Sequence, residues 1–429
     1  MKVLIINYYW PPCGTAGVHR WLKFSKYLKE FDIEPILYVP ENPSYSLVDE
    51  NLLTETEGIQ VLKNKISEPF TFYQRFTGQK SINTGFISEK KEDKNWKKEL
   101  AIWIRGNFFI PDARVFWVKP SVKYLSNYLK NNKIDFIIST GPPHSLHLIA
   151  EKLQKKFNIP WMADFRDPWT TMDYYSKMKI SYLADKKHHR LEKKVVTEAN
   201  IVTVVASQMK KEFDEKYKID TNLLFTGFDE EVSNFEIDES KWYNNLTITH
   251  VGTLLKDRNP KILWKVLAEL KNENPQVYNS IKINLVGRVD NTILEELTDL
   301  SILDRINLIG NVSHFESIKF QKEASVLLLS IDNIANSEFV VTSKLFEYLG
   351  VKRPILCIGN EKGDVHEIIS KLENSYVVGF SDSNNLKDKI FTYYDKMKNE
   401  TLPLIKGGET FSIQNRTKDL ADLLRKNIQ

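Results

Sequence analysis

The chain has 429 residues, of which 42% are hydrophobic and 12% aromatic, and its net charge is +4. This length and composition exclude a disordered tail and allow two domains, each with its own core. The apolar runs are short and the charges are spread throughout, so the sequence predicts no membrane-spanning helix. Cys13 and Cys357 lie far apart and indicate no disulfide framework, and no group of residues has metal-ligand spacing, so we predict no metal site.

The first half of the chain predicts a parallel sheet covered by helices. Short apolar runs without alternation, typical of strands buried on both faces, lie at 3–8, 33–39, 135–139, 161–164 and 201–205. The first run follows Met1-Lys2 directly and leads into large aromatics and prolines, so we interpret it as a strand and not a signal peptide. A cytoplasmic enzyme is therefore expected.

The second half repeats this pattern. Apolar runs lie at 246–251, 281–286, 306–309, 326–329, 355–358 and 376–378, and the acidic segment 227–244 separates the two series. We predict an α/β protein with two Rossmann-like, doubly wound domains at 1–228 and 245–408. We expect a C-terminal helix in 409–429, which could cross back to the first domain. Ligands of such sheets bind beyond the carboxyl ends of the strands, so a cleft between the domains is expected.

Two segments of the first half combine rigid or glycine-containing loops with polar side chains. After the first strand, Gly14 and Gly17 allow a ligand to approach the backbone, and the next helix begins near His19 and Arg20. These two residues could face the cleft or simply face solvent. The strand at 135–139 runs into a Gly-Pro-Pro turn followed by His144, which we select as the principal cleft imidazole.

The next strand, at 161–164, ends in a charged motif. Two carboxylates, Asp164 and Asp167, flank Arg166. They could bind sugar hydroxyls, or they could form an ion-pair network that shapes the cleft. The residues alone leave both interpretations open.

In the second half, three apolar runs are each followed by a turn that contains glycine and polar residues. Gly252 and Thr253 follow one strand, and Arg258 stands before the next helix, where it could reach a phosphate. The Gly287-Arg288 pair ends the following strand. A third turn contains Asn311.

The segment 325–358 has the plan of a nucleotide phosphate site: an apolar strand, a polar loop, a helix start and another strand. Thr342-Ser343 begin a helix that we expect to end at Gly350, and Lys344 adds a positive charge to amides that favour an anion. Glu347 shares a helix face with Ser343 and could accept hydrogen bonds from a ribose. The alternative is a capped amphipathic helix with a solvated Glu347.

Basic and aromatic residues alternate between Lys90 and Lys119, where eight Lys or Arg interleave with six aromatic side chains. Such a segment suits an anionic membrane surface. The alternative is an insertion whose aromatics pack onto their own domain. We do not expect a nucleic-acid partner.

These motifs, in this order, resemble the retaining nucleotide-sugar glycosyltransferases of family 4, which have the GT-B fold. The resemblance covers nearly the whole chain and depends on four motifs, at 11–17, 140–144, 164–169 and 344–348. It implies transfer of a sugar from a nucleoside diphosphate sugar to a hydroxyl of a glycan or lipid-linked acceptor, with retention and without an obligatory metal. It also implies a role in bacterial cell-surface polysaccharide assembly, inside the cell or on the inner face of its membrane.

The resemblance also implies roles for individual residues. The acceptor would bind the N-terminal domain, through residues His19, Arg20, Asp164, Arg166 and Asp167. The catalytic residues would be His144, Glu338, Arg258 and Lys344. The nucleotide sugar would bind residues Gly14, Gly17, Gly252, Thr253, Arg258, Gly287, Arg288, Asn311, Ser343, Lys344 and Glu347.

The chain departs from the family pattern at two positions. The first glutamate of the family's paired motif would fall at Phe339, and Glu338 stands one position away. Thr253 stands where the family commonly has arginine, which leaves Arg258 with more of the phosphate charge. The displaced Glu338 motivates an alternative function, a nucleotide-sugar-binding protein without catalysis.

Overall fold

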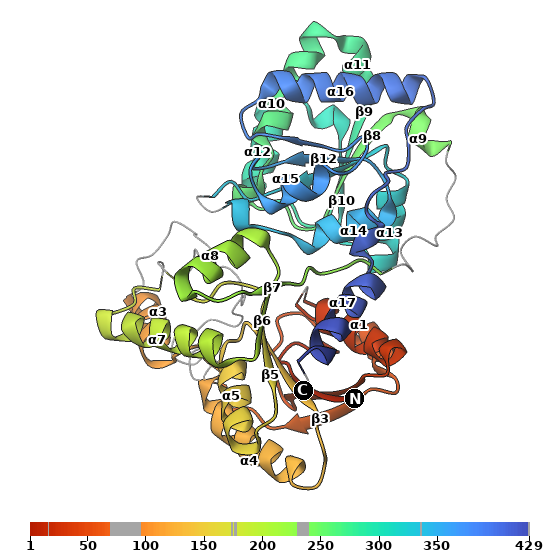
Figure 1. Cartoon of the computed structure of the whole chain (residues 1–429). Coiled ribbons are helices and arrows are strands. Elements are labelled where there is room, and N and C mark those ends of the chain that lie inside the picture. The colour runs from red at the N-terminus through yellow and green to blue at the C-terminus, as the bar shows by residue number, and fades with distance from the viewer. Residues whose placement is uncertain are drawn as a thin grey trace. The chain divides into compact units, whose positions relative to one another are not determined.

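The computed structural model describes residues 1–15, 17–68, 96–172, 175, 178–229, 240–334 and 337–427. The chain divides into unit 1, Met1–Phe225 with Thr417–Gln429, and unit 2, Thr226–Arg416. Each unit is a parallel sheet covered by helices (Figure 1). The predicted architecture of two doubly wound α/β domains is therefore confirmed.

Unit 1 has a seven-stranded sheet in the order β3-β2-β1-β4-β5-β6-β7. Its strands are β1 Lys2–Ile6, β2 Glu34–Pro40, β3 Gln60–Asn64, β4 Phe136–Gly141, β5 Trp161–Phe165, β6 Ile201–Val204 and β7 Asn222–Leu223. The sequence predicted neither edge strand. β3 is polar and largely accessible, and β7 has only two residues, so neither carries the apolar pattern of a buried strand.

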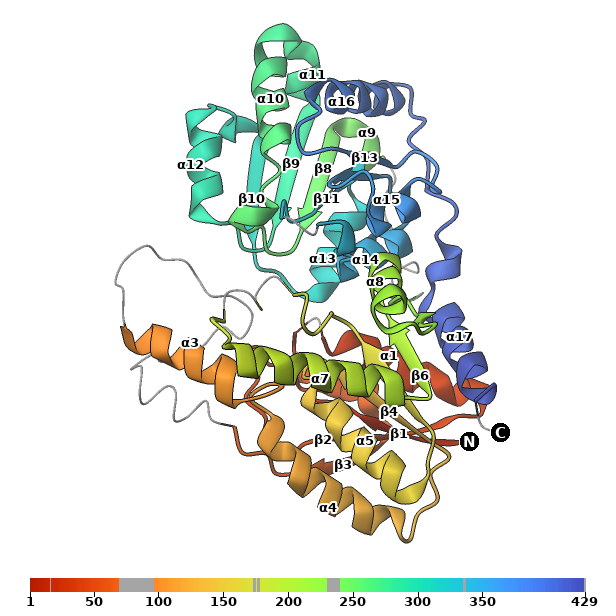
Figure 2. The same ribbon diagram turned by 60° about the vertical axis from the view of Figure 1, so that its left-hand side comes forward.

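Helices cover both faces of this sheet. They are α1 His19–Tyr27, α3 Trp96–Phe108, α4 Val118–Leu129, α5 Ser145–Phe157, α7 Tyr182–Glu198, α8 Ser207–Tyr217 and α17 Ile413–Arg425. α5 packs on β4 and β5, with α4 and α7 beside it (Figure 2). The C-terminal helix α17 belongs to unit 1 from Thr417 onward, where Arg425 donates to the carbonyl of Phe31 at 2.6 Å.

Unit 2 has a six-stranded sheet in the order β10-β9-β8-β11-β12-β13. Its strands are β8 Leu246–Val251, β9 Ile281–Val286, β10 Ile306–Gly310, β11 Val326–Ser330, β12 Ile355–Ile358 and β13 Tyr376–Val378. All six match the predicted runs; the central strands β11 and β12 are buried along their whole length, whereas the edge strand β10 is only half-buried.

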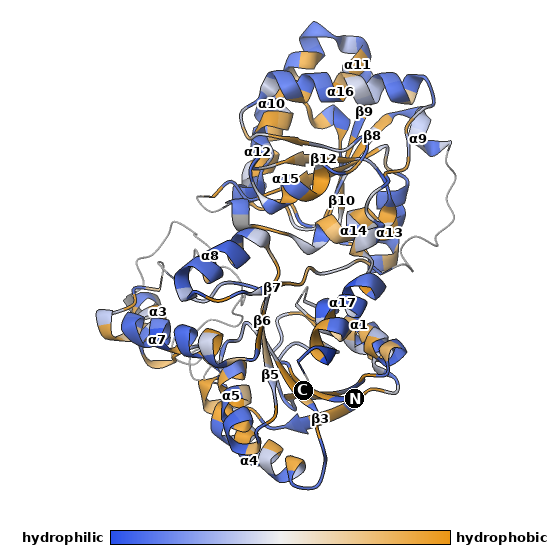
Figure 3. Cartoon of the chain, in the orientation of Figure 1, coloured by the Kyte–Doolittle hydropathy of each residue, from blue (hydrophilic) through white to orange (hydrophobic). Residues whose placement is uncertain are grey.

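The main helices of unit 2 form two layers. They are α10 Lys261–Glu273, α11 Pro275–Ser280, α12 Asn291–Asp299, α13 His314–Lys322, α14 Ser343–Val351, α15 Asp364–Ile369 and α16 Ser383–Lys398. α10, α11, α12 and α16 share one core with the strands. Figure 3 shows the hydrophobic residues gathered on the strands and the polar residues on outer helix faces such as that of α16.

The strand orders place a switch point in each sheet. β1 pairs with both β2 and β4, and β8 pairs with both β9 and β11, so the chain reverses its direction of winding between these neighbours. Open α/β sheets bind ligands at the carboxyl ends of such strands. The loops after β1, β4, β8 and β11 are therefore the places to look for a site.

The expected helix stop at Gly350 is wrong. α14 continues to Val351, and Lys352 caps it in the left-handed conformation with φ 63°. Gly350 instead serves packing, because a Cβ there would lie 2.8 Å from the ring of Phe228. A glycine near a helix end is thus not always its terminator.

Candidate functional site

Two glycines of unit 2 bring the ends of β8 and β9 together. Gly252 and Gly287 have φ values of 108° and 117°, a region that favours glycine. A Cβ on Gly287 would lie 2.8 Å from the carbonyl carbon of Gly252, and one on Gly252 would lie 2.5 Å from Cε of Lys344. The absence of side chains at these glycines therefore lets the Lys344 side chain lie directly on the turn after β8.

Lys344 is the most perturbed cation of the second unit. Its Nζ lies 3.4 Å from Nε2 of His250. Burial, and secondly the Arg258 cation, lower the pKa of Lys344 to about 7, while Asp332 and Glu347 oppose the shift. A partly buried amine beside a second cation is an electrostatic environment that an anionic ligand would relieve.

Arg258 supplies that second cation. Its Nη2 lies 2.5 Å from Oδ2 of Asp332, and its carbonyl accepts from Ser330 at 2.7 Å. Its Nε is buried without a hydrogen-bond partner in the described part of the chain. Asp332 thus holds one end of the guanidinium, and Nε remains without a partner in the described chain.

The N-terminus of α14 adds backbone donors beside Lys344. Thr342 is the N-cap residue, but its side chain makes no capping bond, and its Oγ1 is buried without a partner among the described residues. In that part of the chain we find no acceptor for the amides of Ser343 and Lys344. Such a helix start binds anions.

Glu347 lies one turn further along α14, and α13 holds it. Gln321 Nε2 donates to Oε1 of Glu347, and His314 Nε2 lies 3.4 Å from Oε2. The carboxylate side chain is 28% exposed, so it remains accessible while its orientation is fixed.

The other predicted residues of unit 2 are more exposed. Thr253, Arg288, Asn311 and Ser343 are at the surface. Glu338 lies half-buried in the short helix η7, Ser337–Phe339, and its carboxylate makes no hydrogen bond or ion pair with the residues that the structure describes. The structure brings Lys344, Arg258, Gly252, Gly287 and Glu347 into one neighbourhood.

In unit 1, His144 stands at the N-cap of α5, where β4 ends. Its imidazole stacks on Trp169, with ring centroids 4.7 Å apart and planes at 2°. It is 4% exposed, and neither ring nitrogen has a hydrogen-bond partner among the described residues. Burial, followed by the neighbouring His147, holds the pKa of His144 well below its usual value, so the ring is neutral.

His144 belongs to a row of stacked rings. His147 packs on Phe165 and its Nδ1 lies 2.8 Å from Oγ of Ser139. On the other side, Trp169 donates to Nδ1 of His188 at 3.1 Å. His188 is 2% exposed, because α7 turns it inward although its neighbours in the sequence are lysines, His189 and Arg190.

Asp164 forms a closed ion pair with Arg20. Arg20 Nη2 lies 2.9 Å from Oδ1, and Trp21, Thr140 and Thr203 also donate to this fully buried carboxylate. These contacts of Asp164 agree with the second interpretation of the charged motif, an ion-pair network. Its oxygens are occupied by the protein itself.

We predict that Asp164→Asn destabilises unit 1 by about 3–5 kcal/mol, because it leaves the buried Arg20 cation without its partner. Urea unfolding followed by circular dichroism measures this loss. Asp32→Asn is the matched control, since Asp32 is exposed and its left-handed conformation suits asparagine equally well, so this variant should change stability by less than about 0.5 kcal/mol. Equal losses in both variants would contradict the assignment.

The remaining predicted residues of unit 1 surround the loop after β1. Arg166 donates to the carbonyls of Gly17, at 3.0 Å, and of Pro142, and so ties two loops together. Gly14 packs against residues 47–49, where a Cβ would lie 3.1 Å from that of Asp49. His19 is exposed at the start of α1. Burial raises the pKa of the Asp167 carboxyl, and the Arg166 cation opposes this.

The segment 90–119 is described from residue 96. Trp117 is buried and stacks on Tyr38 at 5.0 Å, whereas Trp103, Phe108 and Phe116 are 39%, 68% and 59% exposed. The segment therefore combines aromatics that pack onto unit 1 with aromatics at the surface. In the described part of the chain, no helix has the length and apolar character needed to cross a membrane.

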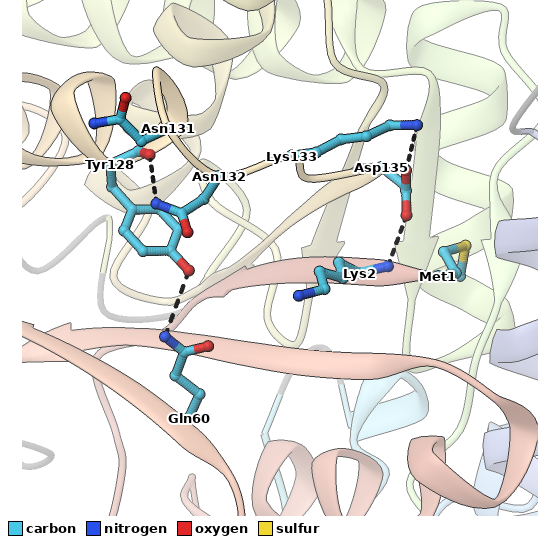
Figure 4. Close-up of a pocket in the computed structure, with 8 residues that line it drawn as sticks. All are labelled: Met1, Lys2, Gln60, Tyr128, Asn131, Asn132, Lys133 and Asp135. Carbon is cyan, nitrogen blue, oxygen red and sulfur yellow. Dashed lines mark hydrogen bonds and ion pairs between the residues drawn. The ribbon is translucent and has the colours of Figure 1, made fainter.

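Figure 4 shows a polar hollow of about 500 Å³ lined by Lys2, Gln60, Tyr128, Lys133 and Asp135, among others. It lies where β1, β3 and β4 begin, at the amino ends of the strands. The candidate residues follow the carboxyl ends of strands, so this hollow is separate from them.

Neither a known family profile nor a curated protein sequence matches the chain. Solved structures do. Sucrose-phosphate synthase from Thermosynechococcus elongatus is 12% identical, with a TM-score of 0.59 over 99% of this chain and 98% of that one. The chain has the GT-B fold.

Two further GT-B neighbours show the same coverage. S. aureus TarM, solved with fondaparinux, alpha-GlcNAc-glycerol and UDP, is 10% identical with a TM-score of 0.58 over 99% of both chains. The lipopolysaccharide outer core galactosyltransferase WaaB is 14% identical, with a TM-score of 0.57 over 99% of this chain and 100% of that one. The structural neighbours thus include glycosyltransferases.

Sequence reasoning assigned no role to His250, Asp332, Gln321 or His314, which surround Lys344, Arg258 and Glu347. His250 carried a usable signal, since it is the one ionisable side chain of the strand Leu246–Val251 and stands two residues before Gly252. Gln321 and His314 carried none, because their helix is close to α14 only in the fold.

Proposed function

We propose that the protein is a retaining glycosyltransferase that moves a sugar from a nucleoside diphosphate sugar to a hydroxyl of a glycan or lipid-linked acceptor. The observation that carries this proposal is the position of the Lys344 ammonium. It lies against Gly252, beside Arg258 and the amides at the start of α14. This arrangement concentrates positive potential at the carboxyl edge of a doubly wound sheet, and the fold of known nucleotide-sugar transferases supports it.

In this reaction the bond between the sugar C1 and the phosphate oxygen breaks, and its electron pair leaves with the diphosphate. The acceptor oxygen bonds to C1 on the same face and passes its proton to the departing phosphate. The protein must stabilise the growing negative charge, and we assign this role to Lys344, Arg258 and the amides of Ser343 and Lys344. No metal is obligatory in this scheme.

Glu347 would accept the ribose hydroxyls of the donor. Its orientation is fixed from α13 by Gln321 and His314, and more than a quarter of its side chain remains exposed. In unit 1, the neutral His144 would position or polarise the transferred sugar, while Asp167 and Arg166 would contribute to acceptor binding. We place the activity in bacterial cell-surface polysaccharide assembly.

Thermal-shift measurements with UDP-, ADP-, GDP- and dTDP-sugars test this function. A ligand at about a hundred times its dissociation constant stabilises a protein by roughly 2.7 kcal/mol. We expect one base to raise the melting temperature of the wild-type protein. Stabilisation by none of them would contradict the proposal.

We predict that Glu347→Ala weakens nucleotide binding by about tenfold to a hundredfold, because two charge-assisted hydrogen bonds to ribose are lost. Calorimetric titration with the nucleotide that stabilises the wild type measures the effect. Glu367→Ala, at an exposed position of α15, is the matched control and should bind normally. Unchanged affinity in Glu347→Ala would contradict the ribose assignment.

The second candidate is a nucleotide-sugar-binding protein that does not catalyse transfer. The specific observation is Glu338, which is displaced by one position and makes no hydrogen bond or ion pair in the described chain. Release of the nucleoside diphosphate from the bound donor, with a crude lipid-linked acceptor, separates the two functions. Binding without release would favour this candidate.

We propose contact between unit 1 and the inner face of the cell membrane through the exposed aromatics of segment 90–119. Trp103, Phe108 and Phe116 offer apolar rings beside exposed cations such as Lys119. We expect co-sedimentation with phosphatidylglycerol vesicles and not with phosphatidylcholine vesicles. The Phe108→Ser/Phe116→Ser double variant should lose this binding, and full retention would contradict the contact.

A further inference from the structure

His250 has a defined protonation state in the fold. Its Nδ1 lies 3.1 Å from the carbonyl oxygen of Leu328, and a carbonyl can only accept a hydrogen bond, so we assign the ring proton to Nδ1. Burial, and secondly the Lys344 cation, hold the pKa of His250 well below its usual value. The imidazole is therefore neutral, and Nε2 presents a lone pair.

That lone pair faces the ammonium of Lys344. Nζ lies 3.4 Å from Nε2, and His250 is 1% exposed, so the ring cannot turn to solvent. The other charged groups that act on Lys344 are Arg258, Asp332 and Glu347. Both carboxylates have nearer partners, since Asp332 pairs with Arg258 and Glu347 accepts from Gln321. Among the described residues, His250 Nε2 is thus the atom placed to accept a hydrogen bond from Lys344.

The end of β8 also forms a hydrogen bond with α14, the helix that carries Lys344. Tyr348, one turn further along α14, accepts from the amide of Val251 at 3.0 Å and lies 3.4 Å from the carbonyl of Leu328. The Leu328 carbonyl therefore contacts both His250 and Tyr348. Lys344 and Tyr348 of α14 are both fixed relative to the turn at Gly252.

We propose that His250 is a positioning residue that orients the Lys344 ammonium toward the diphosphate of the donor. One N–H of Lys344 is directed to His250, and two remain for phosphate oxygens. This inference deepens the proposed function and rests on it. Without the acceptor at Nε2, the flexible side chain of Lys344 would lose its fixed direction, and part of its binding energy would be spent on ordering it.

Two substitutions separate this role from a structural one. The side-chain amide of His250→Asn takes the place of Nδ1, so it keeps the bond to Leu328 and loses the acceptor for Lys344. His250→Gln places an amide oxygen near Nε2, so it keeps that acceptor and loses the bond to Leu328. We expect His250→Asn to weaken UDP, ADP or GDP binding by about tenfold, and His250→Gln to stay within about threefold of wild type.

The opposite order would overturn the proposal, because it would show that His250 only ties β8 to β11. A double-mutant cycle provides a second check: in the Lys344→Met background, His250→Asn should change nucleotide affinity by less than about twofold. A full tenfold loss in that background would mean that His250 does not act through Lys344.

A measurement without nucleotide distinguishes failure of this inference from failure of the proposed function. The ¹³Cε resonance of Lys344, identified by its absence in Lys344→Met, reports titration of the amine. Loss of the acceptor should lower the pKa of Lys344 in His250→Asn by about half a unit or more, and His250→Gln should restore it. Identical titrations in all three proteins would refute the positioning role, even if no nucleotide binds.

Discussion

Lys344→Met is expected to make the ligand-free protein more stable. The native pKa of Lys344 is lowered to about 7, primarily by burial, whereas an unfolded lysine titrates near about 10.4. Between these values the unfolded chain binds more protons, so wild-type stability rises with pH and the cost of the buried charge is complete only below pH 7. Methionine removes that charge and keeps the length of the side chain.

The gain should be on the order of 3 kcal/mol at pH 6 and should shrink toward zero near pH 10. Urea unfolding at these two pH values measures it. Lys282→Met, at an exposed position of β9, is the matched control for adding a methionine and removing a charge, and should show no such pH dependence. A loss of stability in Lys344→Met at pH 6 would contradict the claim that the buried charge of Lys344 destabilises the folded protein.

The same variant should lose the donor. We expect Lys344→Met to bind the nucleotide sugar about a hundredfold more weakly, because an ammonium–phosphate contact in a partly buried site is removed. A bound diphosphate raises the pKa of Lys344, so wild-type affinity should fall about tenfold per pH unit above pH 7, and the variant should lose this slope. Calorimetry between pH 6 and pH 9 measures both effects, and a persistent slope in the variant would exclude Lys344 as its source.

The sheets were predictable because burial on both faces leaves a continuous apolar run. Strands such as β11 and β12 match the predicted ranges, whereas β3 and β7 are the two edge strands of their sheet and lack that signal. The pattern of hydrophobic residues is local, but pairing at an edge depends on a neighbour that is distant in sequence. Prediction therefore succeeded in the sheet centres and at the edge strands β10 and β13, and it failed at the two edge strands of unit 1.

The candidate site could be predicted only at the level of its elements. The loops after β8 and β11 and the start of α14 were visible as glycines and polar residues beside strand ends. The pairing of Arg258 with Asp332, and that of Lys344 with His250, spans more than seventy residues of sequence. Likewise, Asp164 has the sequence context of a ligand-binding carboxylate, and only the fold shows Arg20 beside it.

His144→Ala is expected to slow sugar transfer by about a hundredfold while changing nucleotide affinity by less than about twofold. His144 belongs to unit 1, and the groups assigned to the diphosphate belong to unit 2, so its removal should not affect donor binding through the phosphates. The neutral ring has no hydrogen-bond partner at either nitrogen in the described chain, so the protein itself occupies neither nitrogen. Initial rates and nucleotide titrations of the same preparations separate the two quantities.

His144→Phe decides whether the nitrogens or the ring carry this effect. Phenylalanine keeps an aromatic ring against Trp169, so it preserves the stack and removes only the nitrogens. We expect it to be as slow as His144→Ala. His147→Phe, at the neighbouring position, loses the hydrogen bond to Ser139 and should cost about 1–2 kcal/mol of stability while it retains transfer. Recovery of the rate in His144→Phe would assign His144 to packing and leave the chemistry to the residues around Lys344.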